Sequence, residues 1–188
     1  MTILGTASSV VDGDVSSMRL FDLHCHVDFA PNAASLAVGL DELGVSALSA
    51  TVTPEGYERA VQELAACGNV RVGLGLHPWW VAGSETGDGG EALESFERLV
   101  GSARFIGEIG LDFGARHVAS REAQERAFDR VVSACVKRGD KVLTLHAVRA
   151  AGAVLDALER HRATEGNACV FHWFSGSSGD LQRAIRLG

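Results

Sequence analysis

The sequence predicts an α/β fold of the (β/α)8 TIM-barrel type, incomplete, with about six β-α units. Apolar strand-like runs alternate with amphipathic segments, as in a parallel sheet covered by helices. The first strand is not followed by GxGxxG, which disfavours an open dinucleotide-binding sheet. Polar residues fall at the C-terminal ends of several strands, and in a barrel those ends converge on one mouth. We therefore expect the barrel.

Six runs have the length and apolar content of buried strands. They cover residues 20–28, 46–53, 70–77, 104–112, 141–148 and 168–175. Helical patterns lie between and after them, at 33–43, 54–67, 91–100, 120–139, 150–160 and 180–187. Asn32 and Ser120 are expected to cap two of these helices, and Gly44 and Gly139 to end them.

Length and composition indicate one globular domain. The chain has 188 residues, of which 46% are hydrophobic, enough for a substantial core. We expect residues 1–18 to form a loose N-terminal leader and residues 19–188 to form a barrel that lacks its last strands.

The charge balance excludes some classes of function. A net charge of −7 argues against a module that binds nucleic acid through a basic face. A nucleic-acid substrate stays open, because divalent cations can reverse the local field of an acidic pocket. Four cysteines without a CxxC motif favour a reduced, cytoplasmic protein. The sequence has no apolar run near the roughly 18–20 residues of a membrane span, so we expect no membrane partner.

The first strand carries two histidines in the run FDLHCHVDF. Residues two apart on a strand share a face, so His24 and His26 are expected to point together while Cys25 faces the helices. Two buried imidazoles on one face need partners. The pair therefore predicts either metal ligands or two histidines that sit in the core.

Later strands supply such partners. Glu108 and Asp112 share a face at the end of the fourth strand, and His146 and His172 lie at the ends of the fifth and sixth. Imidazole and carboxylate ligands suit zinc, manganese or magnesium, and a carboxylate such as Glu108 can bridge two ions. Asp112 has a second interpretation, as a hydrogen-bond partner of a histidine or of a water. The set favours a metal centre, whereas His117 and His161 are interpreted as ordinary loop and helix-end residues.

Five segments resemble a known family in order and approximate spacing: FDLHCHVDF, GLHPWW, IGEIGLDF, TLHAVR and FHWFSGS. They are similar to motifs of the TatD-related metal-dependent deoxyribonucleases, a branch of the amidohydrolase-like TIM barrels, over about residues 20–188. The FHWFSGS and HAVRAA forms look closest to the TatD-like component of the Qat anti-phage defence system. The resemblance implies a DNA substrate, phosphodiester hydrolysis by a metal-activated water, and protein partners in a defence complex.

The resemblance also implies two divalent metal ions (Mg, Mn or Zn) that share one carboxylate. One ion would be held by His24, His26 and Glu108, and the other by Glu108, His146 and His172. His77 would line the mouth and contact a phosphate or the attacking water. The candidate catalytic residues are Glu108, His77 and Asp112.

Candidate substrate-binding residues lie around the same mouth. They are Arg149, Trp173 and Ser175. Arg149 can form a bidentate contact to phosphate, or it can simply be a solvated residue at a helix start. Trp173, like Trp79 and Trp80, can stack on bases or pack at the rim.

The family pattern continues beyond this sequence. Its eighth strand ends in an aspartate that completes the first metal site and takes a proton from water, whereas this sequence stops at Gly188. An incomplete sequence and a second chain that closes the barrel are both compatible with this difference. Independent activity is therefore left open, and a non-catalytic or partner-dependent subunit of a defence complex is an alternative.

A barrel amidohydrolase that acts on amides or esters is the other alternative. Many such enzymes bridge two metals with a carboxylated lysine on strand four. This chain has Glu108 there, and its lysines, Lys137 and Lys141, fall elsewhere. The nuclease branch is favoured.

Overall fold

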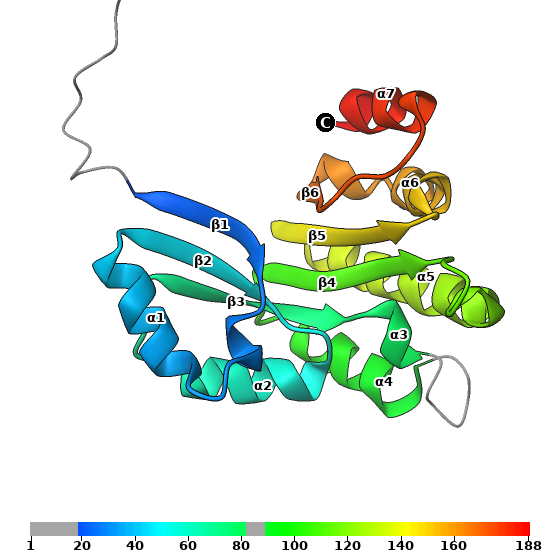
Figure 1. Cartoon of the computed structure of the whole chain (residues 1–188). Helices are drawn as coiled ribbons and strands as arrows, with labels where there is room; N and C mark the ends of the chain where they lie inside the picture. Colours follow the sequence, from blue (N-terminus) through cyan, green and yellow to red (C-terminus); the bar gives the residue numbers. More distant parts are fainter. Residues whose placement is uncertain (1–18, 82–88) are drawn as a thin grey trace, which may run out of the picture.

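The computed structural model describes residues 19–81 and 89–188. Within them, six parallel strands form one curved sheet in the order β1-β2-β3-β4-β5-β6 (Figure 1). The strands are β1 (Leu20–Cys25), β2 (Val45–Ala50), β3 (Val70–Leu76), β4 (Phe105–Asp112), β5 (Lys141–Val148) and β6 (Asn167–Phe171). Sequential parallel pairing confirms the α/β architecture of an incomplete TIM-type barrel with six β-α units.

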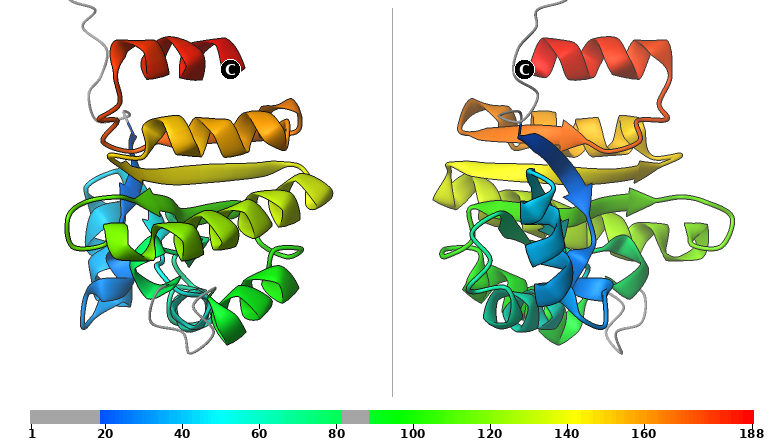
Figure 2. Two further views of the ribbon diagram at one scale, coloured as in Figure 1. Left: turned by 90° about the vertical axis from the view of Figure 1, so that its right-hand side faces the viewer. Right: turned by 60° about the vertical axis from the view of Figure 1, so that its left-hand side comes forward.

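The helices lie outside the curved sheet (Figures 1 and 2). The longer ones are α1 (Ala33–Glu42), α2 (Pro54–Glu63), α4 (Gly90–Leu99), α5 (Arg121–Arg138), α6 (Ala151–Arg160) and α7 (Ser178–Leu187). The short ones are α3 (Pro78–Val81) and 3-10 turns at Val27–Phe29, Val118–Ser120 and Ala163–Glu165. In both views of Figure 2, α7 runs beside α6.

Sequence signals located both the starts and the ends of α1 and α5. Gly44 and Gly139 have φ values of 69° and 65° and follow α1 and α5, as predicted. Asn32 and Ser120 occupy the N-cap positions of α1 and α5, as predicted, but in the part of the chain described neither side chain accepts a capping hydrogen bond. The Ser120 hydroxyl instead donates to the carbonyl of His117, at 2.8 Å.

Three of the predicted strands end at least three residues early in the structure. The predicted strand 20–28 ends at Cys25, the predicted strand 46–53 ends at Ala50, and the predicted strand 168–175 ends at Phe171. As a result, His26 and His172 lie just beyond their strands, where the backbone is free to turn toward the centre of the sheet.

A pair of hydrogen bonds fixes the turn after β1. The Ser49 hydroxyl donates to the carboxylate of Asp28 at 2.6 Å, and the backbone N–H of Asp28 donates to the same hydroxyl at 3.2 Å. These bonds hold the 3-10 turn Val27–Phe29 against β2. They therefore explain why the apolar run does not continue as a strand after His26.

The buried apolar residues form two cores of different size. The larger core lies between β3–β6 and the helices α4–α6, and it is built from large side chains that include Leu74, Phe96, Ile106, Ile109, Val132, Leu143, Leu145 and Leu158. The smaller core lies under α1 and consists of Val27, Ala33, Ala37, Ala47, Leu64 and Val70. The β1 side is therefore held by less buried apolar surface.

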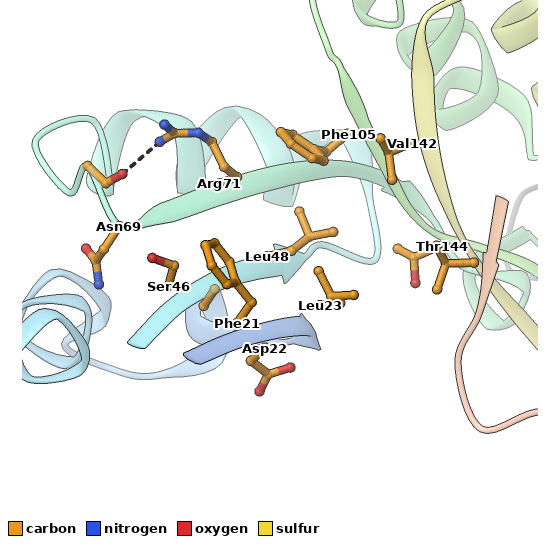
Figure 3. Close-up of a pocket in the computed structure, with 13 residues that line it drawn as sticks. Phe21, Asp22, Leu23, Ser46, Leu48, Asn69, Arg71, Phe105, Val142 and Thr144 are labelled. Carbon is orange, nitrogen blue, oxygen red and sulfur yellow. Dashed lines mark hydrogen bonds between the residues drawn. The ribbon is translucent and has the colours of Figure 1, made fainter. Parts of the chain in front are cut away.

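The concave face of the sheet borders a cavity of about 370 Å³ (Figure 3). Phe21, Leu23 and Leu48 line it from β1 and β2, together with Phe105 and Val142. Phe21 is 70% exposed and Leu23 is 60% exposed. These are the inward positions that fill the interior of a barrel.

Two further predictions concern regions and surroundings. The predicted leader, residues 1–18, lies outside the described residues. Among the helices that are described, none is both long and apolar enough to cross a bilayer. A cytoplasmic location stays a prediction.

Candidate metal centre

Glu108 of β4 lies at the centre of the site and is 4% exposed. Imidazoles surround both of its carboxylate oxygens. The distances to Oε2 are 3.5 Å from His24 Nε2 and 3.6 Å from His26 Nε2. The distances to Oε1 are 2.7 Å from His146 Nδ1, 3.4 Å from His172 Nδ1 and 3.7 Å from His77 Nε2. The structure thus brings together every predicted metal ligand, and it adds His77.

Close packing of the strands makes this convergence possible. A Cβ atom at Gly75 would lie 1.6 Å from the carbonyl oxygen of Thr51, and one at Gly110 would lie 2.0 Å from the carbonyl oxygen of His146. Larger residues at these two positions would separate β4 from its neighbours. The glycines of GLGL and GEIG therefore bring Glu108 within reach of histidines on both sides.

The potential ligand atoms form two groups of three, each within 4.8 Å. We name His24, Glu108 and His172 the edge cluster, because His24 lies in β1 and His172 directly follows β6. We name His77, Glu108 and His146 the inner cluster, because its histidines belong to β5 and the residue after β3; all three are buried. Which histidines would share which ion stays a prediction.

The edge cluster and the neighbouring His26 leave three ring nitrogens without a hydrogen bond to any described residue. Among the described residues, His24 Nε2, His26 Nδ1 and His172 Nδ1 are buried and unpartnered. His24 Nδ1 lies 2.7 Å from the hydroxyl of Thr144, so a ring proton there leaves the Nε2 lone pair facing Glu108. Two acceptors that face each other are stabilised by a cation between them. These residues therefore fit a divalent metal.

The two ends of the sheet meet at this cluster. The rings of His24 and His172 stack with centroids 3.8 Å apart and an interplanar angle of 3°. His24 belongs to β1 and His172 follows β6, so the sheet curls far enough for side chains from its two ends to meet.

Glu108 is ionised in this environment. Burial alone raises the pKa of its carboxyl group, but the hydrogen bond from His146 and the nearby imidazole of His77 outweigh burial and hold that pKa well below its usual range. The centre therefore contains a carboxylate anion, as a bridging metal ligand must be.

His77 faces the same carboxylate as a neutral ring. Burial lowers the pKa of His77 to about 3, despite the opposing charge of Glu108. Its Nδ1 accepts the backbone N–H of Trp79 at 3.2 Å, which assigns the ring proton to Nε2. His77 thus presents an N–H donor toward the centre, which suits a contact to an oxygen better than a role as metal ligand.

Asp112 lies behind His146 rather than beside Glu108. Its Oδ2 is 3.3 Å from His146 Nε2, on the opposite side of the ring from Glu108. Burial raises the pKa of Asp112, but hydrogen bonds from the Trp79 indole and the Gly114 backbone outweigh this effect. The net pKa of Asp112 is lowered, so the group is a carboxylate. The geometry supports the second interpretation of Asp112, as a partner that orients a histidine.

A cavity of about 500 Å³ opens above the centre, and most of the predicted substrate residues line it. Trp173 is 91% exposed and its ring stacks on His172, with centroids 5.9 Å apart. Ser175 also lines the cavity and donates to the carbonyl of Ala147 at 3.3 Å. Arg149 is exposed after β5 and lies outside the lining of the described cavity.

Sequence reasoning missed two supporting residues. Thr144 precedes His146 by two positions on β5, and this period of two was the available signal for a shared face. Gln124 is buried on the apolar face of α5; its Oε1 accepts the backbone N–H of Asp112 at 2.7 Å. A polar residue on an apolar helical stripe was the signal for it.

Residues interpreted as ordinary occupy structural positions. His161 lies 2.8 Å from the carboxylate of Asp129, away from the centre. Cys25 packs against the core under α1, on the helix side as predicted. Lys141 donates to the carbonyl of Ala103 at 2.6 Å, at the N-terminal end of β5. The position of Lys141 weakens the lysine-bridged alternative.

Fold and site together define a TIM-type barrel whose histidine and glutamate cluster fits a divalent metal. The family model described as TatD related DNase matches residues 21–188, and the chain belongs to this family. Its curated relative in Escherichia coli (strain K12), described as the uncharacterized metal-dependent hydrolase YjjV, is 27% identical over 175 residues. That match covers 90% of this chain and 66% of the relative, so the chain spans slightly less than two thirds of it.

Two solved structures resemble the fold. The crystal structure of the TatD homologue YjjV from Escherichia coli K12 matches with a TM-score of 0.75 and 26% identity, over 90% of this chain and 66% of that one. A TatD-family hydrolase from Entamoeba histolytica matches with a TM-score of 0.69 and 16% identity, over 90% and 63%. The second likeness concerns the fold alone.

Proposed function

We propose that the chain acts as a divalent-metal-dependent hydrolase of DNA phosphodiester bonds. The observation that carries the proposal is the Glu108 carboxylate, whose two oxygens face different imidazoles below a cavity of about 500 Å³. The ligands would be His24, His26, Glu108, His146 and His172, with magnesium, manganese or zinc as the ions. When bound, a pair of such ions lowers the pKa of water and neutralises charge on phosphoryl oxygens.

The chain's own residues would divide the remaining work. Glu108 supplies the shared negative charge that holds the ions. The Nε2–H of His77 would donate to a phosphate oxygen or to the attacking water, since the ring is neutral and its proton is held toward the centre. Asp112 would keep the ring of His146 in place.

The aromatic rim supports a nucleic-acid substrate. Trp80 and Trp173 line the cavity and expose much of their rings, and base stacking on such a ring contributes about 1–3 kcal/mol. Because the chain carries a net charge of −7, attraction for a polyanion would come mainly from the bound cations. Arg149 would add a phosphate contact at the edge of the mouth.

The test is cleavage of DNA by the purified chain. Single-stranded and duplex oligonucleotides with a fluorescent end label are incubated with Mg²⁺, Mn²⁺ or Zn²⁺, beside Glu108→Gln with an unchanged circular dichroism spectrum. We expect metal-dependent shortening of DNA with the wild type and none with the variant. Turnover of amides or esters without turnover of DNA would favour the barrel amidohydrolase.

A partner-dependent role in anti-phage defence is the second proposal. The specific observation is the form of two motifs, FHWFSGS and HAVRAA, which resemble the Qat component. In this case the chain binds metal but cleaves DNA only with its partners. Phage plating on cells that express the chain together with its genomic neighbours, with and without Glu108→Gln, tests this proposal; equal plating would contradict it.

A further inference from the structure

Trp79 joins the rim of the cavity to the metal centre. The side chain is 48% exposed, yet its indole N–H donates to Asp112 Oδ2 at 2.6 Å. The ring also stacks on His117, with centroids 4.8 Å apart and an interplanar angle of 14°. A half-exposed tryptophan is thus held in one orientation from both its edge and its face.

The contact continues inward through two further steps. Asp112 Oδ2, the oxygen that Trp79 holds, lies 3.3 Å from His146 Nε2. His146 Nδ1 lies 2.7 Å from Glu108 Oε1. Three short contacts therefore connect the indole of Trp79 to the central carboxylate.

Asp112 itself has little freedom to move. The backbone N–H of Gly114 donates to Oδ1 at 2.8 Å. The buried amide of Gln124 accepts from the Asp112 backbone N–H at 2.7 Å and donates to its carbonyl at 3.0 Å. With the backbone and Oδ1 fixed, the indole of Trp79 sets the remaining orientation of Oδ2.

We propose that Trp79 is a positioning residue: its indole N–H holds the Asp112 carboxylate against His146 and so fixes the ring orientation of a metal ligand. A carboxylate behind a ligating histidine fixes both its tautomer and its direction. The proposal rests on the metal-binding part of the proposed function and is independent of the substrate. It also gives Trp79 a role different from base stacking.

The test measures Co²⁺ binding to the full chain through the visible absorption of the ion, which reports on ligand geometry. Trp79→Phe keeps the ring and removes the donor, and Trp80→Phe is the matched control on the neighbouring, similarly exposed tryptophan. We expect Trp79→Phe to raise the Kd for Co²⁺ about tenfold and to change the absorption band. Trp80→Phe should leave both within about twofold of the wild type.

A double-mutant cycle separates positioning from general packing. Asp112→Asn should raise the Kd for Co²⁺ about 10–100-fold. If Trp79 acts through Asp112, adding Trp79→Phe to that variant changes the Kd by no more than about twofold. Additive effects, or an unchanged Kd in Trp79→Phe, would overturn the proposal.

If Trp79→Phe does not fold, nuclear magnetic resonance of ¹⁵N-labelled indoles tests the proposal without that variant. The Trp79 N–H should exchange slowly with solvent in the wild type and faster in Asp112→Asn, while Trp80 is unaffected. Equal exchange of Trp79 and Trp80 in the wild type contradicts the proposal. A wild-type chain that binds no Co²⁺ overturns both the positioning role and the metal centre, whereas Co²⁺ binding without DNA cleavage affects only the proposed substrate.

Discussion

The edge cluster and the inner cluster share Glu108 but differ in how well their histidines are buried and hydrogen-bonded. The inner histidines, His77 and His146, are buried, and each has a hydrogen-bond partner on its second nitrogen. The edge histidines, His24 and His172, belong to the outermost described strands, are partly exposed and contain unpartnered nitrogens. The inner half of the site is therefore preorganised by the fold, and the arrangement of the edge half would depend more on a bound metal.

The two cores explain the difference. Large aliphatic residues pack beneath β4 and β5, whereas the region under β1 is held by a small cluster rich in alanine. Less buried apolar area gives lower local stability. A metal that joins the two clusters would therefore stabilise β1 more than β5.

Replacing Glu108 should weaken metal binding at both clusters, because both contain its carboxylate. Glu108→Gln keeps the shape of the side chain and removes its charge. Mutating a residue that hydrogen-bonds to a metal ligand raises the Kd by up to about 100-fold. We expect Glu108→Gln, which changes a ligand itself, to raise the Kd for Co²⁺ by more than that. Titration calorimetry measures it; a Kd within tenfold of the wild type would mean that Glu108 is not a ligand.

Core substitutions should separate the two regions in stability. Leu145→Ala beneath the inner cluster is expected to cost about 2–5 kcal/mol of unfolding free energy, since the side chain is completely buried. The matched change Leu23→Ala on β1 should cost less than about 0.5 kcal/mol, because that side chain is mostly exposed. Urea denaturation of both variants measures this; equal costs would place a hidden packing contact on β1.

The residues behind the ligands should differ in strength. A neutral hydroxyl of Thr144 contacts the ring of His24, and the charged carboxylate of Asp112 contacts the ring of His146. Thr144→Val should therefore raise the Kd for Co²⁺ by about 2–10-fold, since a neutral hydrogen bond contributes about 0.5–1.5 kcal/mol. Asp112→Asn is the reference, and a larger effect of Thr144→Val would reverse the assigned order.

Thiol labelling should detect the smallest difference, local opening. Burial raises the pKa of Cys25 on β1 to about 11 and the pKa of Cys135 in α5 to about 12, so both thiols react slowly. We expect Cys25 to be labelled through local opening at urea concentrations where Cys135 is still protected. Mass spectrometry of labelled peptides follows both sites, and simultaneous labelling would show that β1 opens only with the whole domain.

The sequence predicted which side chains come together because their signals are local. A period of two made His24 and His26 cofacial, and the ends of parallel strands in a barrel converge, which placed Glu108 and His146 together. The strand ends were less accurate, because the Asp28–Ser49 hydrogen bonds that stop β1 join residues 21 apart.

The hydrogen-bond partners that orient the site residues could not be predicted from the sequence. The contact from Trp79 to Asp112 joins residues 33 apart, and nothing in the pattern GLHPWW tells which tryptophan turns inward. The tautomer of His77 depends on a backbone N–H that only the fold of α3 places. Such features arise from packing between elements, which single-sequence patterns do not describe.

The stacked rings of His24 and His172 have a consequence for laboratory evolution. Two parallel rings 3.8 Å apart make the best residue at one position depend on the residue at the other. Because both residues are also candidate metal ligands, a library that varies the two positions together should recover few active pairs other than the original two histidines. The joint between the first and last described strands would then be inherited as one unit.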